Sequence, residues 1–287
     1  MYETIYQLLS DSKEQNIPLH ELILEDESEY AHTSQSIIIE RLNKTLSTMK
    51  QSLEKALQSE AELPIKQASG QSKKMLSPGI FFHSDMKDAT AWAMAIGEYN
   101  SGMGLIVACP TAGSSGVVPA TLLKAREILN KSDDDLLNAL IVVGAVGAII
   151  GNQAMLSGSE GGCQAEVGVA SAMAAAGITY MAGGNHDQIS NAIALTLTNV
   201  LGLVCDPVAG LVISPCIKRN AMGVVNAFLA AEMALSGVTS IIPADEVIVA
   251  MMKVGRKIPY ELKETGKGGI AGTKTGKRIK KEIFKED

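Results

Sequence analysis

Apolar residues recur at helical spacing along most of this chain. Between residues 34 and 60 they are three or four positions apart, which is the repeat of one face of an amphipathic helix: Ile37, Ile38, Leu42, Leu46, Met49, Leu53 and Leu57. From residue 84 onward one apolar helical run follows another, and no alternating strand pattern of useful length occurs. The pattern predicts an all-α protein.

Polar residues that cap helices mark where several of these runs begin. Helices are predicted over residues 85–99 after Ser84, 133–150 after Ser132 and 186–204 after Asn185. Prolines at positions 119 and 243 open two more, the second over 244–257. Alanine and glycine supply much of the apolar content, so we expect a compact bundle of buried helices that approach each other closely.

The N-terminal part of the chain has a different character. Residues 1–33 are acidic, with an early helix interrupted at Pro18, and form either a solvated face or a docking arm. Residues 61–78 are rich in Ser, Gly, Lys and Gln, which is typical of a linker. We therefore expect an N-terminal helical segment and linker over 1–78 and a larger domain over 79–287.

Composition and charge indicate a soluble protein. The net charge of −6 disfavours nucleic acid as a partner. Two stretches, 139–151 and 191–217, carry almost no charge, but the first is shorter than the ~20 residues that span a bilayer and the second contains Asp206, Pro207 and Pro215. We expect no membrane span and, because the N-terminus has no secretory pattern, a cytoplasmic protein with reduced cysteines.

Three cysteines lie where glycine or proline interrupts a helix. Cys163 follows Gly161-Gly162, Cys205 precedes Asp206-Pro207, and Cys216 follows Pro215, with separations of 42 and 11 residues. Such breaks allow thiolates to leave a helix surface and share a centre. Three sulfur ligands leave one position open, as in a catalytic zinc site or a four-iron cluster with one free iron. The alternative is that they are buried core residues.

A second candidate site is the turn Thr111-Ala-Gly-Ser-Ser-Gly116, directly before a predicted helix. Backbone N–H groups at a helix start bind anions, and Ser114 and Ser115 add hydroxyl donors. The turn lacks the Lys-Ser/Thr of a nucleotide-binding loop, so a substrate carboxylate fits better than a phosphate. The alternative is that the motif is only a turn that reverses the chain.

Four sequence segments closely resemble the iron–sulfur-dependent L-serine dehydratases, and the chain is similar to the α subunit of the two-subunit type. They are EGGCQAEVGVASAMAAA at 160–176, GLVCDPVAGLV at 202–212, PCIKRNAMG at 215–223 and CPTAGSSGVVP at 109–119. The resemblance covers about residues 87–277. It implies an L-serine ammonia-lyase that forms pyruvate and ammonia without pyridoxal phosphate, in serine catabolism that feeds pyruvate metabolism and gluconeogenesis.

The resemblance also implies which residues form the site. Cys163, Cys205 and Cys216 would hold an oxygen-sensitive [4Fe–4S] cluster that acts as a Lewis acid. The substrate L-serine would be bound by the turn and by one residue of the third cysteine segment: Thr111, Ser114, Ser115, Gly116 and Asn220. Cys109 is expected to be a pocket or core residue and not a ligand.

The general base is not identified by the sequence. The candidates are two acidic residues near the cysteines, which alternatively orient the cluster or form ion pairs, and two histidines: Glu166, Asp206, His83 and His186. The resemblance suggests that a β subunit supplies the missing group, so the β subunit is the expected partner. Residues 253–287 carry eleven Lys or Arg against five Asp or Glu and would either close over an anionic substrate or form a solvated tail.

Two other function classes remain open from the residues alone. One is another [4Fe–4S] hydro-lyase, or an electron carrier, although no second cluster motif is present. The other is a non-catalytic metal-binding subunit whose cysteines hold zinc, which would be colourless where an iron–sulfur cluster is coloured.

Overall fold

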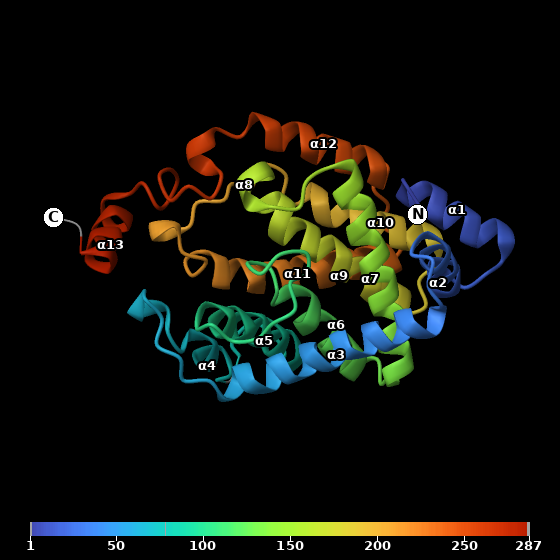
Figure 1. The fold of residues 1–287 in the computed structure, drawn as a ribbon, viewed down its shortest axis with the longest axis horizontal. Helices are drawn as coiled ribbons and strands as arrows, with labels where there is room; N and C mark the ends of the chain where they lie inside the picture. Colours follow the sequence, from blue (N-terminus) through green and yellow to red (C-terminus); the bar gives the residue numbers. More distant parts are fainter. Residues whose placement is uncertain (1, 78, 286–287) are drawn as a thin grey trace.

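The computed structural model describes residues 2–77 and 79–285, and in this part of the chain all regular structure is helical (Figure 1). The predicted all-α class is therefore confirmed. The α-helices are α1 (Ile5–Gln15), α2 (Leu19–Tyr30), α3 (Gln35–Gln58), α4 (Gln71–Met75), α5 (Ser84–Ser101), α6 (Val117–Ile128), α7 (Asp133–Gln153), α8 (Gly158–Gly161), α9 (Val169–Met181), α10 (His186–Thr198), α11 (Cys216–Leu235), α12 (Ala244–Lys257) and α13 (Lys274–Phe284).

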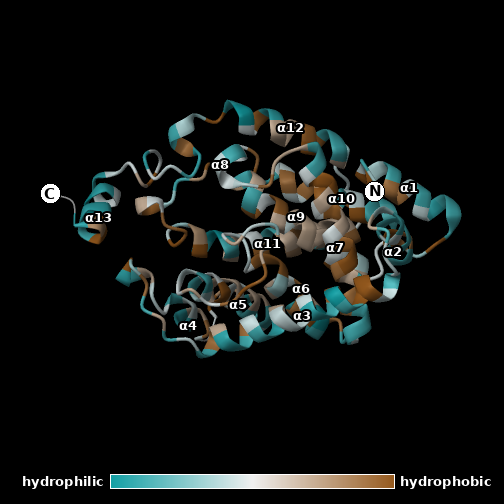
Figure 2. Ribbon diagram, in the orientation of Figure 1, coloured by the Kyte–Doolittle hydropathy of each residue, from teal (hydrophilic) through white to brown (hydrophobic). Residues whose placement is uncertain are grey.

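Helix α9 lies at the centre of the bundle. It packs against α6, α7, α10 and α11, and all its residues except Tyr180 are buried. Small residues bring these helices together, because a Cβ added at Gly177 would lie 2.6 Å from Cγ2 of Val143 and one at Gly223 would lie 2.8 Å from Oγ of Ser171. The apolar centre is visible in Figure 2. The predicted bundle of buried Ala/Gly-rich helices is confirmed.

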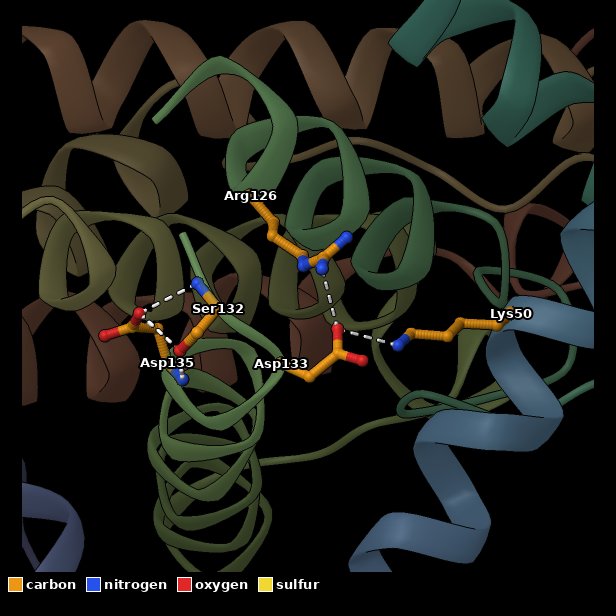
Figure 3. Close-up of polar contacts among 5 residues, drawn as sticks. All are labelled: Lys50, Arg126, Ser132, Asp133 and Asp135. Carbon is orange, nitrogen blue, oxygen red and sulfur yellow. Dashed lines mark hydrogen bonds and ion pairs between the residues drawn. The ribbon is translucent and has the colours of Figure 1, made fainter. Parts of the chain in front are cut away.

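Helix α7 is long and apolar enough to span a bilayer, but most of its apolar stretch is buried, as in a core helix of a soluble protein. Its predicted cap is confirmed: Oγ of Ser132 accepts from the Asp135 N–H at 3.1 Å, and Asp135 accepts from the Ser132 N–H at 2.9 Å. Next to it, Asp133 pairs with Lys50 of α3 at 2.9 Å and Arg126 of α6 at 3.0 Å (Figure 3). This end of α7 therefore joins three helices.

The N-terminal helices pack on the same core as the rest of the protein. Ile5 and Leu8 of α1 and Met49 of α3 are buried in a cluster shared with α7 and α9. The carboxylate of Asp245, the second residue of α12, accepts from the N–H groups of Ile5 and Tyr6 at 2.9 Å each, which satisfies free donors at the start of α1. Helix α12 begins after Pro243, as predicted.

The stretch predicted as a linker is folded where the structure describes it. Residues 61–77 contain a 3₁₀ turn, Lys66–Ala68, and the short helix α4. Leu63 and Ile65 are buried in a second, smaller core cluster together with Met94 of α5. The expected division into 1–78 and 79–287 has its boundary at residue 78, which lies outside the described residues, as do 286–287 at the end of the second part. The division stays a prediction.

Several predicted helix ends differ from the structure, and α5 and α7 extend past the predicted residues 99 and 150 to Ser101 and Gln153. Helix α5 begins at Ser84 itself, with His83 at the cap position and no side-chain bond there. Helix α6 begins at Val117, because the turn before it already forms the bond from the Val117 N–H to the Ser114 carbonyl at 3.0 Å. Helix α10 ends at Thr198 and not at residue 204, since Gly202 has a positive φ of 86° that a right-handed helix cannot contain.

Candidate functional site

The three predicted cysteines lie at interruptions of the helical structure and are all buried, with Cys216 as the first residue of α11. Cys163 lies between α8 and a π-helical turn, Gln164–Gly168, that leads into α9. Gly162 before it has a φ of 77°, and a Cβ there would lie 2.7 Å from the Leu203 carbonyl oxygen. The glycine thus allows the segment after α10 to approach the Cys163 turn. Single π-turns of this kind are frequent at functional sites.

Gln164 fixes that approach. Its amide oxygen accepts from the Gly202 N–H at 2.9 Å, and its amide nitrogen donates to the carbonyls of Gly161 and Met251 at 3.0 and 2.9 Å. The Gln164 side chain is fully buried, so water does not compete for these hydrogen bonds. Gln164 therefore joins α12 and the two cysteine-bearing segments. The sequence prediction missed it, although it directly follows Cys163.

The three thiols share one electrostatic environment. Burial raises the pKa of Cys205 and of Cys216, and for both the charge of Cys163 raises it further. Burial also raises the pKa of Cys163, to about 11, while the nearby Arg219 guanidinium opposes that rise. The structure therefore brings the three cysteines together, although they are 53 residues apart in sequence. Buried sulfurs grouped in this way are suitable donors for a soft metal.

Cys109 shares the main core cluster with Cys163 and Cys205 but differs from the three grouped cysteines in its electrostatic environment. It is buried in the main core cluster, and burial alone raises its pKa to about 12. None of the other three cysteines contributes to that shift. The Cys109 N–H donates to the Thr111 carbonyl at 3.3 Å, so the residue shapes the turn that follows it. Its position agrees with the expected core role.

Glu166 lies beside the cysteines and contacts the Thr111 turn. The Thr111 hydroxyl donates to Oε1 of Glu166 at 2.5 Å. A Cβ at Gly113 would lie 2.5 Å from the same oxygen, and one at Gly158 would lie 3.2 Å from Oε2 and 2.6 Å from Sγ of Cys205. Burial raises the pKa of Glu166, and the Thr111 bond partly opposes this. The carboxylate is thus held between two glycines, next to a candidate ligand.

The turn predicted to bind an anion is held against α11. Asn220 accepts from the Gly116 N–H at 3.0 Å and donates to the carbonyls of Gly113 and Cys216 at 2.7 and 2.9 Å. Its amide therefore links the turn to a candidate ligand, and its predicted contact with substrate stays a prediction. Ser114 is fully buried, 3.1 Å from the Thr111 hydroxyl. The Ser115 hydroxyl is buried without a hydrogen-bond partner in the described structure.

Asp206 and Arg219 form a buried ion pair next to the cysteines. Oδ1 of Asp206 accepts from Nη2 of Arg219 at 2.9 Å, and Nη1 donates to the Val204 carbonyl at 2.8 Å. Contacts with Cys163 and Asp206 raise the pKa of the guanidinium against the effect of its burial. Both oxygens of Asp206 are engaged, because Oδ2 accepts from the Ile270 N–H at 2.8 Å. Asp206 is therefore held as an ion-pair partner.

The two candidate histidines lie away from this group. His186 begins α10 and its Nε2 is 2.9 Å from the Ser12 hydroxyl of α1, whereas Cys205 follows the other end of α10. A helix of this length spans about 20 Å. His83 is exposed at the start of α5, ten residues before Ala93, whose carbonyl lies beside Gly116. The structure brings Glu166 and Asp206 to the cysteines and leaves both histidines outside.

Comparison with known proteins gives a consistent result over nearly the whole chain. The family model described as serine dehydratase alpha chain matches residues 14–271. The "probable L-serine dehydratase, alpha chain" of Bacillus subtilis is 46% identical over 292 aligned residues, covering 99% of this chain and 96% of that protein. The L-serine dehydratase alpha chain of Peptoniphilus asaccharolyticus is 42% identical, covering 100% and 99%. Escherichia coli L-serine dehydratase 1 is 33% identical, and the match covers 94% of this chain and 61% of that protein.

Proposed function

Because this chain belongs to the serine dehydratase alpha-chain family, we propose roles for the polar groups near its three grouped cysteines in the conversion of L-serine to pyruvate and ammonia. The chain is the alpha chain of an L-serine ammonia-lyase, in a family of iron–sulfur-dependent serine dehydratases. The single observation that carries the proposal is the grouping of three buried cysteines beside the Thr111–Glu166 hydrogen bond.

The donor set fits an iron–sulfur cluster. Cys163, Cys205 and Cys216 supply three soft sulfur ligands, and the glycine at position 158 allows the backbone to lie close to Cys205, because a Cβ there would be 2.6 Å from its sulfur. Among residues 2–77 and 79–285, no three His, Cys, Asp or Glu side chains are arranged to hold a single metal ion. What supports a cluster over a single zinc ion is the chain's membership of a family of iron–sulfur-dependent serine dehydratases. We assign these cysteines to a [4Fe–4S] cluster.

When bound, such a cluster supplies a Lewis acid for the substrate hydroxyl, which otherwise is a poor leaving group. The chain's own residues perform the remaining tasks. Ser114 and Ser115, directly before α6, bind the substrate carboxylate, where the positive end of the helix favours negative charge, and Gly116 holds the turn in place because its N–H donates to Asn220. The unpartnered Ser115 hydroxyl is the donor left free for this contact.

Glu166 is the proposed acceptor of the Cα proton. Burial raises its pKa, which makes the carboxylate a better base than an exposed glutamate, and Thr111 holds one of its oxygens in place. Removing the proton and expelling the hydroxyl produces aminoacrylate, which hydrolyses to pyruvate and ammonia after release. Burial of the group excludes water from the proton transfer.

An alpha chain implies a beta chain as its partner. The Escherichia coli relative is longer than this chain, which covers 61% of it, so additional residues accompany the alpha-type region in that protein. We propose that the beta chain associates with this chain in the active enzyme, which works in the cytoplasm. If the beta chain provided the base instead of Glu166, activity would survive the replacement of Glu166 by Gln.

The test is anaerobic co-expression with the beta chain, followed by iron and sulfide analysis and a pyruvate assay with L-serine. We expect about four irons per alpha chain, a brown colour and serine-dependent pyruvate formation. We expect the colour and the activity to be lost on exposure to air. A colourless active protein that contains zinc would contradict the cluster assignment. A coloured protein that produces no pyruvate from L-serine would contradict the proposed roles of Thr111 and Glu166.

A further inference from the structure

Cys205 is the one candidate ligand whose backbone pairs with the C-terminal part of the chain. Its N–H donates to the Leu262 carbonyl at 2.9 Å, and its carbonyl accepts from the Glu264 N–H at 2.7 Å. These bonds form a parallel bridge between Cys205 and Lys263. Cys163 adjoins a π-helical turn and Cys216 begins α11, whereas Cys205 lies outside any helix, between α10 and the 3₁₀ turn Val208–Gly210. Its orientation therefore depends on this pairing.

The side chain of Asp206 also connects the Cys205 segment to the C-terminal part of the chain. One oxygen accepts from Arg219 of α11, and the other accepts from the Ile270 N–H, 64 residues further along the chain. The side chain is 4% exposed. Because Arg219 also donates to the Val204 carbonyl and contacts the Cys163 thiol, the ion pair connects both sides of Cys205 to a second candidate ligand.

Glycine allows the C-terminal segment to approach this closely. Gly269 has a φ of 55°, and a Cβ there would lie 2.2 Å from Oδ2 of Asp206. Gly266, with a φ of 65°, lies so close to Gly210 that a Cβ would be 2.7 Å from its backbone nitrogen. Any side chain at position 269 would push the segment away from the carboxylate. Figure 1 shows this segment, between α12 and α13, at the same end of the molecule as the start of α11.

We propose that residues 262–270 form a strap that fixes the sulfur of Cys205 for cluster binding, and that Asp206 is the positioning residue that holds the strap in place. This inference rests on the proposed function, since it assigns a task to a residue next to a proposed ligand. Asp206 acts through Cys205 and Arg219 and contacts neither substrate nor iron. Groups that orient metal ligands typically change metal affinity or activity 10- to 100-fold when removed.

The first test compares Asp206→Asn with Asp245→Asn in the complex with the beta chain. Both carboxylates accept hydrogen bonds from backbone N–H groups, but Asp206 accepts from the strap, whereas Asp245 caps α1 and has no contact with the strap in these bonds. We expect Asp206→Asn to lower iron per chain and to bleach at least tenfold faster in air than the wild type. Asp245→Asn lowers the melting temperature while its visible spectrum and bleaching rate stay those of the wild type.

The second test compares two Gly→Ala substitutions at positive φ, of which only one places a Cβ against Asp206. Gly269→Ala and Gly237→Ala both place a side chain at a positive φ, but a Cβ at Gly237 meets nothing within 4 Å. In metal-free protein, labelling of Cys205 with a thiol reagent, located by peptide mass spectrometry, reports how firmly the strap holds it. We expect labelling to be at least tenfold faster in Gly269→Ala and Asp206→Asn, and unchanged in Gly237→Ala.

The outcomes separate the two proposals. Wild-type protein that binds no iron and sulfide under anaerobic conditions would contradict the proposed function, whereas the labelling rates would still decide whether the strap holds Cys205. Wild-type iron content, bleaching and labelling in both Asp206→Asn and Gly269→Ala would overturn the strap. Faster bleaching in Asp245→Asn to the same degree would also overturn it, because the effect would then follow from general loss of stability.

Discussion

The hydroxyl of Thr111 donates a 2.5 Å hydrogen bond to Oε1 of Glu166, joining the turn before α6 to the helix break that carries Cys163. The two residues are 55 positions apart in sequence. The turn proposed to bind the substrate carboxylate and the residue proposed to take its proton therefore move as one unit. Substrate bound by the turn lies at a fixed place relative to the base.

Replacing Thr111 with Val removes this bond while keeping the shape of the side chain. A hydrogen bond to a charged group contributes about 1.5–3 kcal/mol, so we expect kcat/KM for L-serine to fall roughly 10- to 100-fold, mainly through kcat. The matched control is Thr198→Val, which removes a bond to the Ala194 carbonyl within α10 and leaves kcat unchanged. Steady-state kinetics under anaerobic conditions test this, and an unchanged kcat in Thr111→Val would refute the role of the bond.

Single serine substitutions distinguish the three grouped cysteines from Cys109. Replacing Cys163, Cys205 or Cys216 removes a sulfur ligand, and we expect the iron content and the visible absorption to be lost in each case. Cys109→Ser keeps the iron, because Cys109 is not one of the three proposed ligands and none of them contributes to its raised pKa. Iron analysis on anaerobically purified protein measures this. Full iron in Cys205→Ser, or none in Cys109→Ser, would contradict the ligand set.

Two buried asparagines separate loss of stability from loss of substrate binding. Asn220→Ala and Asn226→Ala each leave buried groups unpaired at a cost of about 1–3 kcal/mol, so both lower the melting temperature. Only Asn220 holds the turn before α6, and only its replacement raises KM for L-serine. Thermal unfolding and kinetics on both variants test this. Equal KM values would mean that the turn keeps its shape without Asn220.

Stability is expected to decrease as the pH falls below about 6.5. Burial lowers the pKa of His20 and of His186 from their ordinary value of 6.5, so the folded protein favours neutral rings while the unfolded chain binds protons first. The stabilisation is complete above pH 6.5 and is lost as the pH falls through the lower folded values. Chemical denaturation between pH 5 and pH 8 measures it, and His186→Gln should flatten the curve. A free energy of unfolding that increases as the pH falls from 8 to 5 would contradict the lowered histidine pKa values.

The sequence predicted best those features that depend on neighbouring residues. The Ser132 cap, the start of α12 after Pro243 and the amphipathic α3 follow from local side-chain chemistry, and each is present. The three cysteines expected near one another come together in the structure, and their role as cluster ligands stays a prediction. What the sequence motifs left open was the base, for which four residues were candidates.

The features that were missed depend on bonds between distant parts of the chain. Gln164 forms hydrogen bonds with Gly202 and Met251, and Asp206 accepts one from Ile270. No local sequence pattern predicts either set of contacts. The end of α10 was placed six residues too late, because the turn after Thr198 is fixed by Gln164. The histidines were candidates by their chemistry alone, and only the packing of α10 against α1 removes His186 from the site.

The cap that Asp245 provides for α1 has a consequence for biosynthesis. Residue 245 leaves the ribosome 240 residues after Ile5, which at roughly 5–20 residues per second is a delay of about 12–48 s. During that time the first helix lacks its final cap, and Ile5 and Leu8 have no complete core to cover them. Helix α1 is thus translated early but capped late, and nascent chains stalled before position 245 would leave it accessible to chaperones and proteases.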